Sequence, residues 1–246
     1  MINSRRGLLL VAALTAVTAL LILFPARIAY QWAAPSQIAV SGIQGTVWRG
    51  TADAAAANGI YLRDISWRIR PLHLFTGKVS YRVQGSPPAG FVEGNVGLSL
   101  FGTLTVSDLA ASLPLQMFAE SLNIRGLRGD ASLRFERIQL RDGLPVVANG
   151  TLQVNNLVAP RLSRESIGGY QAEFSTQDNG VAASVEDVDG VVDLAGSFQI
   201  KDDRSYQFLG QVIAKQEAPA SLRQQLQYLG SANDRGQREL RVEGSL

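Results

Sequence analysis

The sequence contains no cysteine, which excludes disulfides, thiolate nucleophiles and cysteine-based metal sites. Its one histidine, His73, has no second histidine or H-E-x-x-H motif around it. The sequence therefore predicts neither a histidine metal site nor a histidine that acts as a general base. It also lacks a Walker loop, a G-x-S-x-G elbow and a dinucleotide-binding fingerprint. We therefore expect no catalytic residue, no metal, no cofactor and no small-molecule substrate, which argues against an enzyme.

One acidic segment, Glu186–Gly190, has the character of a calcium loop. An EF-hand loop needs glycine at its sixth position and a carboxylate at its twelfth. Counted from Asp187, those positions are Val192 and Phe198. The pattern fails, so we expect an acidic turn between strands.

Lysine is rare, and the basic character of the chain rests on arginine. Lysines occur only at positions 78, 201 and 215, whereas Lys and Arg together number 23. Residues 1–100 carry nine basic against three acidic residues, but most of those arginines stand singly on predicted strand faces. A nucleic-acid site would need a cluster or a helical stripe of basic residues. We therefore predict no nucleic-acid partner, and interpret these arginines as a solvated strand face.

An uncharged run rich in Leu, Ala and Val extends from Gly7 to Phe24, after Arg5 and Arg6. Spanning a bilayer takes about 20 residues, with a lower limit near 17. The alternative is a cleaved signal peptide, whose apolar region is usually about 7–15 residues long. The greater length favours an uncleaved anchor, and the preceding arginines place the tail in the cytoplasm. We therefore predict a cytoplasmic tail (1–6), a transmembrane signal-anchor in contact with the membrane (7–24), a juxtamembrane linker (25–37) and an exported domain (38–246).

The exported part reads as many short strands at roughly ten-residue spacing, separated by turn signals. Asp142-Gly143 is the strongest of these signals, and the stretch 201–204 is another. Two short amphipathic helices are predicted, one after Pro114 and one over 219–229. Few helices and many alternating strands favour an antiparallel sheet. The predicted fold is mainly β: an N-terminal transmembrane helix followed by a meander-rich antiparallel sheet domain with two short helices.

A weak internal repeat offers an alternative organisation of this domain. Two glycine-flanked segments, 41–45 and 124–129, each precede a long alternating strand. The domain is therefore either one continuous sheet or two lobes with a break near 110–128.

Two tryptophan motifs follow the apolar run. In the first, Gly45 to Gly50, glycines bracket a short predicted strand whose one large side chain is Trp48. The second alternates Ile65, Trp67 and Ile69 with polar residues, which is typical of a half-buried strand. A proline then ends that strand, since it lacks the N–H that a central ladder requires. Each tryptophan is interpreted either as a core anchor or as a partner contact.

Together, the apolar run, the G-T-V-W-x-G motif and the later W-x-I-x-P-x-x-L motif resemble protein N of the general secretion pathway, an accessory inner-membrane component of the bacterial type II secretion system. The resemblance implies a single-pass protein of the bacterial inner membrane with a periplasmic C-terminal domain. It also implies partners among the other inner-membrane components of that system. The motif residues that it singles out, as structural or partner-contact positions, are Gly45, Trp48, Gly50, Trp67, Pro71, Leu74 and Gly77.

Two functions remain open on the sequence. The first is a non-catalytic scaffold that binds other secretion components through its β-rich domain. The second is a lipid-handling module with an apolar β-groove. An accessible apolar trough would favour the second, whereas filling of that face by Trp48, Trp67 and their neighbours would favour the first. An envelope hydrolase is a distant third.

Overall fold

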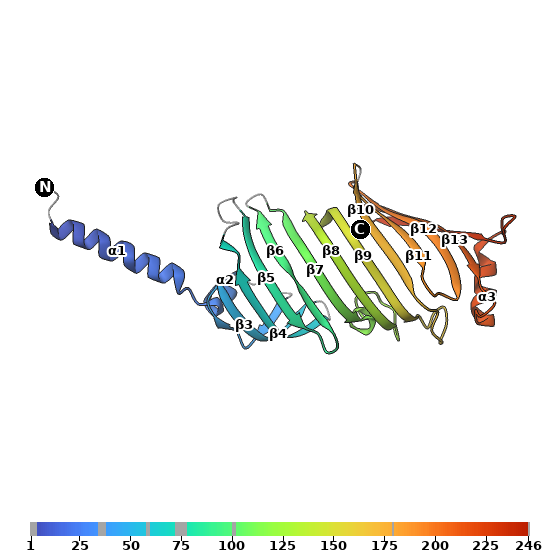
Figure 1. Ribbon diagram of the computed structural model, residues 1–246, viewed down its shortest axis with the longest axis horizontal. Helices are drawn as coiled ribbons and strands as arrows, with labels where there is room; N and C mark the ends of the chain where they lie inside the picture. Colours follow the sequence, from blue (N-terminus) through green and yellow to red (C-terminus); the bar gives the residue numbers. More distant parts are fainter. Residues whose placement is uncertain are drawn as a thin grey trace.

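The computed structural model describes residues 4–33, 38–57, 60–71, 78–99, 102–178 and 180–245. They form an extended antiparallel sheet in which the long strands follow one another in chain order (Figure 1). The strands are β1 (Ile38–Ser41), β2 (Gln44–Gly45), β3 (Arg49–Ala57), β4 (Ile60–Ile69), β5 (Lys78–Ser86), β6 (Phe91–Ser99), β7 (Leu104–Pro114), β8 (Arg128–Arg141), β9 (Leu144–Val158), β10 (Tyr170–Gln177), β11 (Gly180–Asp187), β12 (Val192–Lys201), β13 (Ser205–Ala214) and β14 (Arg238–Ser245).

The sheet is a meander from β3 to β14, with β1 beside β3 at one end and the short β2 paired to β3. The helical segments are α1 (Ser4–Ile22), α2 (Ala26–Ala33), α3 (Ala220–Leu226) and the 3-10 turns η2 (Leu115–Phe118) and η3 (Gln227–Leu229). The prediction of a mainly β, antiparallel fold is confirmed. Whether the chain divides into two lobes stays a prediction, but the strands that flank 110–128, β7 and β8, pair with each other.

Alternation along the strands gives the sheet one apolar and one polar face. Residues directly opposite in the register share a face, so Phe135 of β8 lies in a row with Leu109 and Gly150. The row continues through Phe174 to Phe198. The next row belongs to the other face and contains mostly polar residues, among them Arg134, Thr151, Glu173, Ser184, Ser197 and Arg241.

The core is a series of clusters along the apolar face. Phe135, Ala148 and Val181 form the middle cluster, and the rings of Phe135 and Phe174 lie 5.4 Å apart. Around η2, Leu115 and Leu127 pack on Ala131, while α3 packs through Leu222 on Ile167, Val192 and Val212. The short helical segments therefore cover parts of the apolar face, because a single sheet needs a second layer to bury it.

The turn chemistry follows the sequence closely. Asp142 and Gly143 join β8 to β9 with both φ angles positive, 52° and 79°, as a tight hairpin requires.

The segment predicted as a helix over 219–229 is α3 followed by η3, with Pro219 at its N-cap. The helix predicted after Pro114 is only the four-residue η2.

The prediction of a membrane-spanning anchor, and with it the inner-membrane localisation, is wrong. α1 has 19 residues, but Arg5 and Arg6 occupy its first turn and it ends at Ile22. Its uncharged part, Gly7 to Ile22, therefore falls below the lower limit of about 17 residues. None of the helices in the described ranges combines the length and apolarity of a membrane span.

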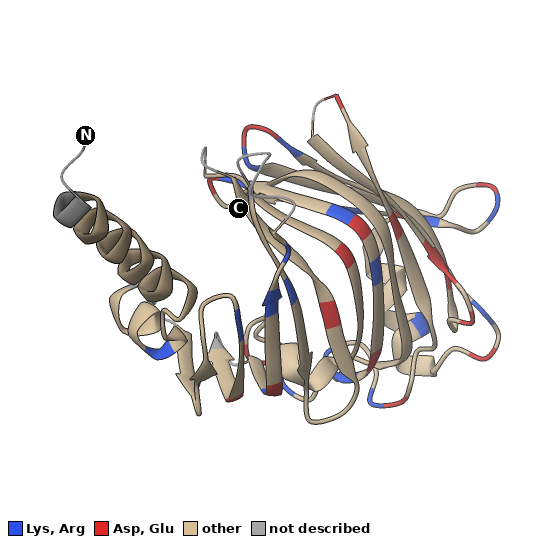
Figure 2. Cartoon of the chain, turned by 60° about the vertical axis from the view of Figure 1, so that its left-hand side comes forward, with Lys and Arg blue, Asp and Glu red and all other residues tan. Residues whose placement is uncertain are grey.

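The first helices are attached to the β2–β3 end of the sheet. α1 projects away from it (Figure 1), and from Gly7 onward α1 carries no charge (Figure 2). α2 lies within the segment 25–37 that the sequence predicted to be a linker. There Pro25 forms an isolated bridge with Thr46, and the Val47 backbone N–H donates to the carbonyl of Phe24 at 3.0 Å.

Candidate functional site

The first tryptophan motif is a hairpin turn. Gly45 of β2 pairs with Gly50 of β3, and the Thr46 backbone N–H donates to the carbonyl of Arg49 at 2.9 Å. Gly45 has φ +87°, and a Cβ there would lie 2.5 Å from the carbonyl oxygen of Arg49. Only glycine meets both conditions. The prediction of a short strand around Trp48 is therefore wrong, since the residues between Gly45 and Arg49 form the turn that joins β2 to β3.

The second motif places Trp67 across that hairpin. Trp67 of β4 stands opposite Gly50 in the register. A Cβ on Gly50 would lie 2.3 Å from Cζ2 of Trp67, so the indole lies over the bare backbone of the glycine. Its Nε1 donates to the carbonyl of Thr46 at 3.2 Å. The two motifs thus form one structural unit. The missing side chain of Gly50 leaves space for the indole of Trp67, and the indole N–H is hydrogen-bonded to the turn at Thr46.

Trp48 connects the hairpin to the preceding helix. Its Nε1 donates to the carbonyl of Leu21 at 2.7 Å, near the end of α1, and its own carbonyl accepts from the Ile69 N–H at 2.7 Å. The side chain is half-buried. It satisfies a terminal helix carbonyl, which otherwise has no partner within the helix.

The remaining motif residues contribute less to this unit. β4 ends at Ile69, before Pro71, as predicted, and Pro71 is exposed. Leu74, Gly77 and His73 lie outside the described residues.

A cleft of about 660 Å³ lies beside the hairpin on β3, β4 and β5. Four arginines line it: Arg49, Arg68, Arg70 and Arg82. Polar side chains and residues of the two tryptophan motifs complete the lining. Arg49 stands directly opposite Arg68, and Arg68 directly opposite Arg82. In the sequence these arginines resemble single solvated residues, because they are spread from position 49 to position 82 and only the strand register brings them together.

Polar residues of β6 and β7 continue this row. Asn95 stands opposite Arg82 and is 3 % exposed. Its Nδ2 donates to Oδ2 of Asp108 at 2.7 Å, where β7 has a bulge. Glu93 accepts from Nε2 of Gln84 at 3.3 Å. Carboxylates therefore lie next to the cleft, on β6 and β7 beside Arg82, whereas the charged residues that line the cleft itself are arginines.

Two cavities on the other face are lined almost wholly by apolar side chains. One of about 420 Å³ lies between α2 and the sheet, and Trp67 and Tyr81 line it. Burial raises the pKa of Tyr81. The second, about 410 Å³, lies between α3 and the sheet, where burial raises the pKa of Tyr170 to about 12. Both volumes fall within the usual range for ligand pockets.

The acidic segment is an ion-paired turn. Asp187 accepts from Nζ of Lys215 at 2.6 Å and from the Leu194 backbone N–H at 3.1 Å. Burial alone would raise the pKa of Asp187, but these hydrogen bonds outweigh it and hold the pKa below its ordinary value. Within the described residues, no three His, Cys, Asp or Glu side chains are grouped so as to hold a metal ion.

Comparison with known proteins confirms the family that the sequence resembles. The family described as type II secretion system (T2SS), protein N, matches residues 36–241. The chain is 25 % identical to the type II secretion system protein N of Vibrio cholerae serotype O1 (strain ATCC 39315 / El Tor Inaba N16961), over 94 % of each chain. It is 21 % identical to the protein of the same name from Pectobacterium carotovorum subsp. carotovorum, over 90 % of each chain. No solved structure matches it. With the family match covering most of its length, this chain belongs to the protein N family of the type II secretion system.

Proposed function

We propose that the protein is a non-catalytic assembly component of the type II secretion system, and that it binds other components through its β-sheet. The observation that carries this proposal is the open edge of the sheet at β14. Within the described residues β14 pairs with β13 alone. A strand edge presents unpaired backbone groups that can accept a strand from another chain.

The opposite edge of the sheet, at β1, is covered by a helix of the same chain. The Tyr30 hydroxyl, from α2, donates to the carbonyl of Ile38 at 2.7 Å and accepts from the N–H of Val40 at 3.0 Å. Since these backbone groups belong to β1, α2 occupies that edge. The contrast supports β14 as the edge for a partner strand.

Charged side chains on β14 make its edge selective. Arg241 donates from Nε to Oε1 of Glu243 at 2.7 Å, and Glu243 also accepts from Nε2 of Gln207 at 2.7 Å. Charges on an edge strand discourage indiscriminate pairing. A partner must therefore match the charges as well as the strand.

Site-specific photocrosslinking in secreting cells tests this proposal. A photoreactive phenylalanine at position 239 of β14, which keeps the Arg241–Glu243 pair, should crosslink to another secretion component. The matched control is position 195, which is exposed and lies in the same row of the same face, but on the interior strand β12. Equal crosslinking at both positions, or none at 239, would contradict binding at this edge.

A second candidate function is favoured by the two apolar cavities. A carrier of acyl chains needs apolar space that stays open, and the cavities beneath α2 and α3 offer it. Native mass spectrometry of the chain purified under non-denaturing conditions separates the two functions. An assembly component should carry no stoichiometric lipid, whereas one or more lipids per chain without any crosslinked secretion component would favour the carrier.

A further inference from the structure

Three arginines stand in one uninterrupted row across neighbouring strands. Arg49 of β3, Arg68 of β4 and Arg82 of β5 are direct cross-strand neighbours. Adjacent strands lie about 4.8 Å apart, so the row spans roughly 10 Å. Arg70 follows Arg68 by two residues and shares its face. Like charges directly opposite each other destabilise a sheet, so the row costs stability unless an anion offsets it.

The neighbouring side chains compensate this charge only at one end. Among the described side chains the ion pairs are Lys215–Asp187 and Arg241–Glu243, both far along the chain. Asp108 and Glu93 flank Arg82, but among the described residues no carboxylate lines the cleft that contains Arg49 and Arg68. All three arginines of the row are exposed to solvent. The β3–β4 part of the cleft therefore offers positive charge to an external ligand.

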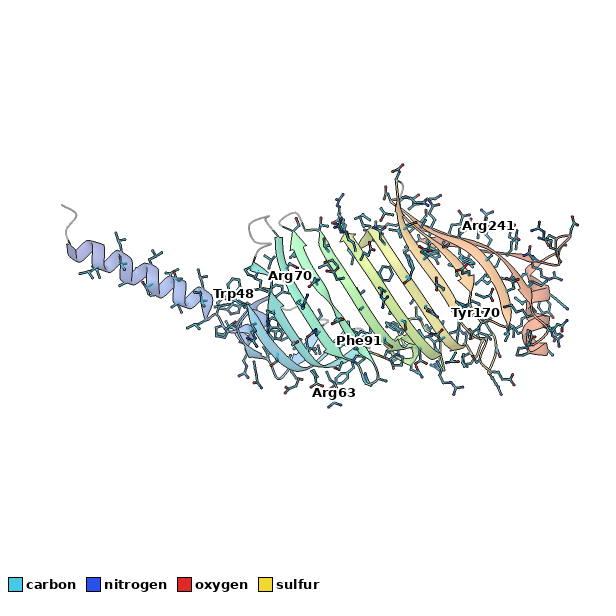
Figure 3. All side chains as sticks on the ribbon, in the orientation of Figure 1. Trp48, Arg63, Arg70, Phe91, Tyr170 and Arg241 are labelled. Carbon is cyan, nitrogen blue, oxygen red and sulfur yellow. The ribbon has the colours of Figure 1, made fainter. Side chains whose placement is uncertain are left out.

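We propose that this cleft docks an acidic, extended segment of a partner protein. Arginine forks bind carboxylates in pairs of parallel hydrogen bonds, and arginine is enriched where interfaces are strongest. Several guanidinium groups spread over about 10 Å suit a series of carboxylates better than one small anion. The proposal rests on the assembly role proposed above but uses a different surface. Figure 3 places Arg70 near the α1 end of the sheet and Arg241 near the other.

Fluorescence anisotropy with the full-length chain tests the proposal. The probe is a fluorescein-labelled peptide of alternating glutamate and serine, and the variant is R49Q/R68Q/R82Q. We expect its affinity for the peptide to fall about tenfold or more, the equivalent of about 1.4 kcal/mol. The variant should melt no lower than the parent chain, since the substitutions remove like-charge repulsion. The matching peptide of glutamine and serine should not bind.

Two control variants separate this site from general charge effects. R125Q/R161Q/R223Q removes the same charge from exposed positions elsewhere and should change the affinity less than twofold. R49K/R68K/R82K keeps the charge but loses the forks, so it should bind more weakly than the parent. Equal losses in the R125Q and R49Q triple variants would overturn the proposal. So would displacement of the peptide by inorganic phosphate at equal concentration, which would indicate a small-anion site. Neither result depends on crosslinking at β14.

Discussion

Trp67 and Gly50 face each other across β3 and β4, and the indole occupies the space that any side chain at position 50 would need. A Cβ on Gly50 would lie 2.3 Å from Cζ2 of Trp67 and 2.4 Å from the carbonyl oxygen of Gln44. The second of these atoms belongs to the backbone and has little freedom to move. The spacing of the two tryptophan motifs along the chain thus reflects a single contact in the sheet.

Gly50→Ala should therefore destabilise the protein by about 1–3 kcal/mol, because the added methyl overpacks the hairpin. Thermal unfolding followed by circular dichroism measures the loss. Gly85→Ala on β5 is the control, since a Cβ there meets its nearest atom at 3.6 Å. Equal melting temperatures for the two variants would show that the indole moves aside freely.

Trp67→Ala should cost about 3 kcal/mol, because the half-buried ring packs in the apolar lining of the cavity beneath α2 and its N–H donates to the carbonyl of Thr46. Trp67→Phe keeps part of the ring and should cost less. The measurement is the free energy of unfolding in urea for the full-length chain. If Trp67 served only as a partner contact, both variants would unfold like the parent and lose only association.

Tyr30→Phe should expose the edge of β1. It removes the hydroxyl that binds Ile38 and Val40, a loss of about 1 kcal/mol in stability. The freed backbone groups should also promote self-association, which sedimentation velocity at increasing concentration detects. Tyr61→Phe, an exposed tyrosine on β4, is the control. A variant that remains as monodisperse as this control would show that the hydroxyl does not protect the edge.

Asp187→Asn should reduce stability near pH 7 by about 1 kcal/mol, since the ion pair with Lys215 is partly exposed. The folded-state pKa of Asp187 is lowered, so its contribution is present above about pH 4 and is lost as the pH falls through the lowered value. Its hydrogen bond raises the pKa of Lys215, whose contribution is present below about pH 10.4 and is lost as the pH rises through the raised value.

Unfolding measured against pH should therefore show a difference between parent and Asp187→Asn that is constant from about pH 5 to 9 and shrinks on either side. Glu243→Gln, in the exposed pair with Arg241, should show a smaller difference at every pH. A difference that does not change with pH would mean that the stabilisation does not come from ionised groups.

Local sequence patterns predicted the parts of this fold that depend on neighbouring residues. Alternation predicted the strand from Ile65 to Ile69, because side chains of a strand alternate between faces. Asp142-Gly143 predicted a tight hairpin, because both positions need positive φ. Such patterns did not predict the length of the first helix: the apolar run extends from Gly7 to Phe24, but the helix ends at Ile22.

The sequence by itself determined an antiparallel meander, hairpin turns such as Asp142-Gly143 and the positions of the two tryptophan motifs, since each depends on residues close together in the chain. Only the tertiary structure decided which side chains these strands and turns bring together and which strand edges stay open. The strand register placed Gly50 under Trp67 and aligned Arg49 with Arg68 and Arg82. It also left β14 open while Tyr30 covered β1. The physical reason is that register and edges arise from backbone pairing between distant segments, and a shift of one residue moves every side chain of a strand to the other face.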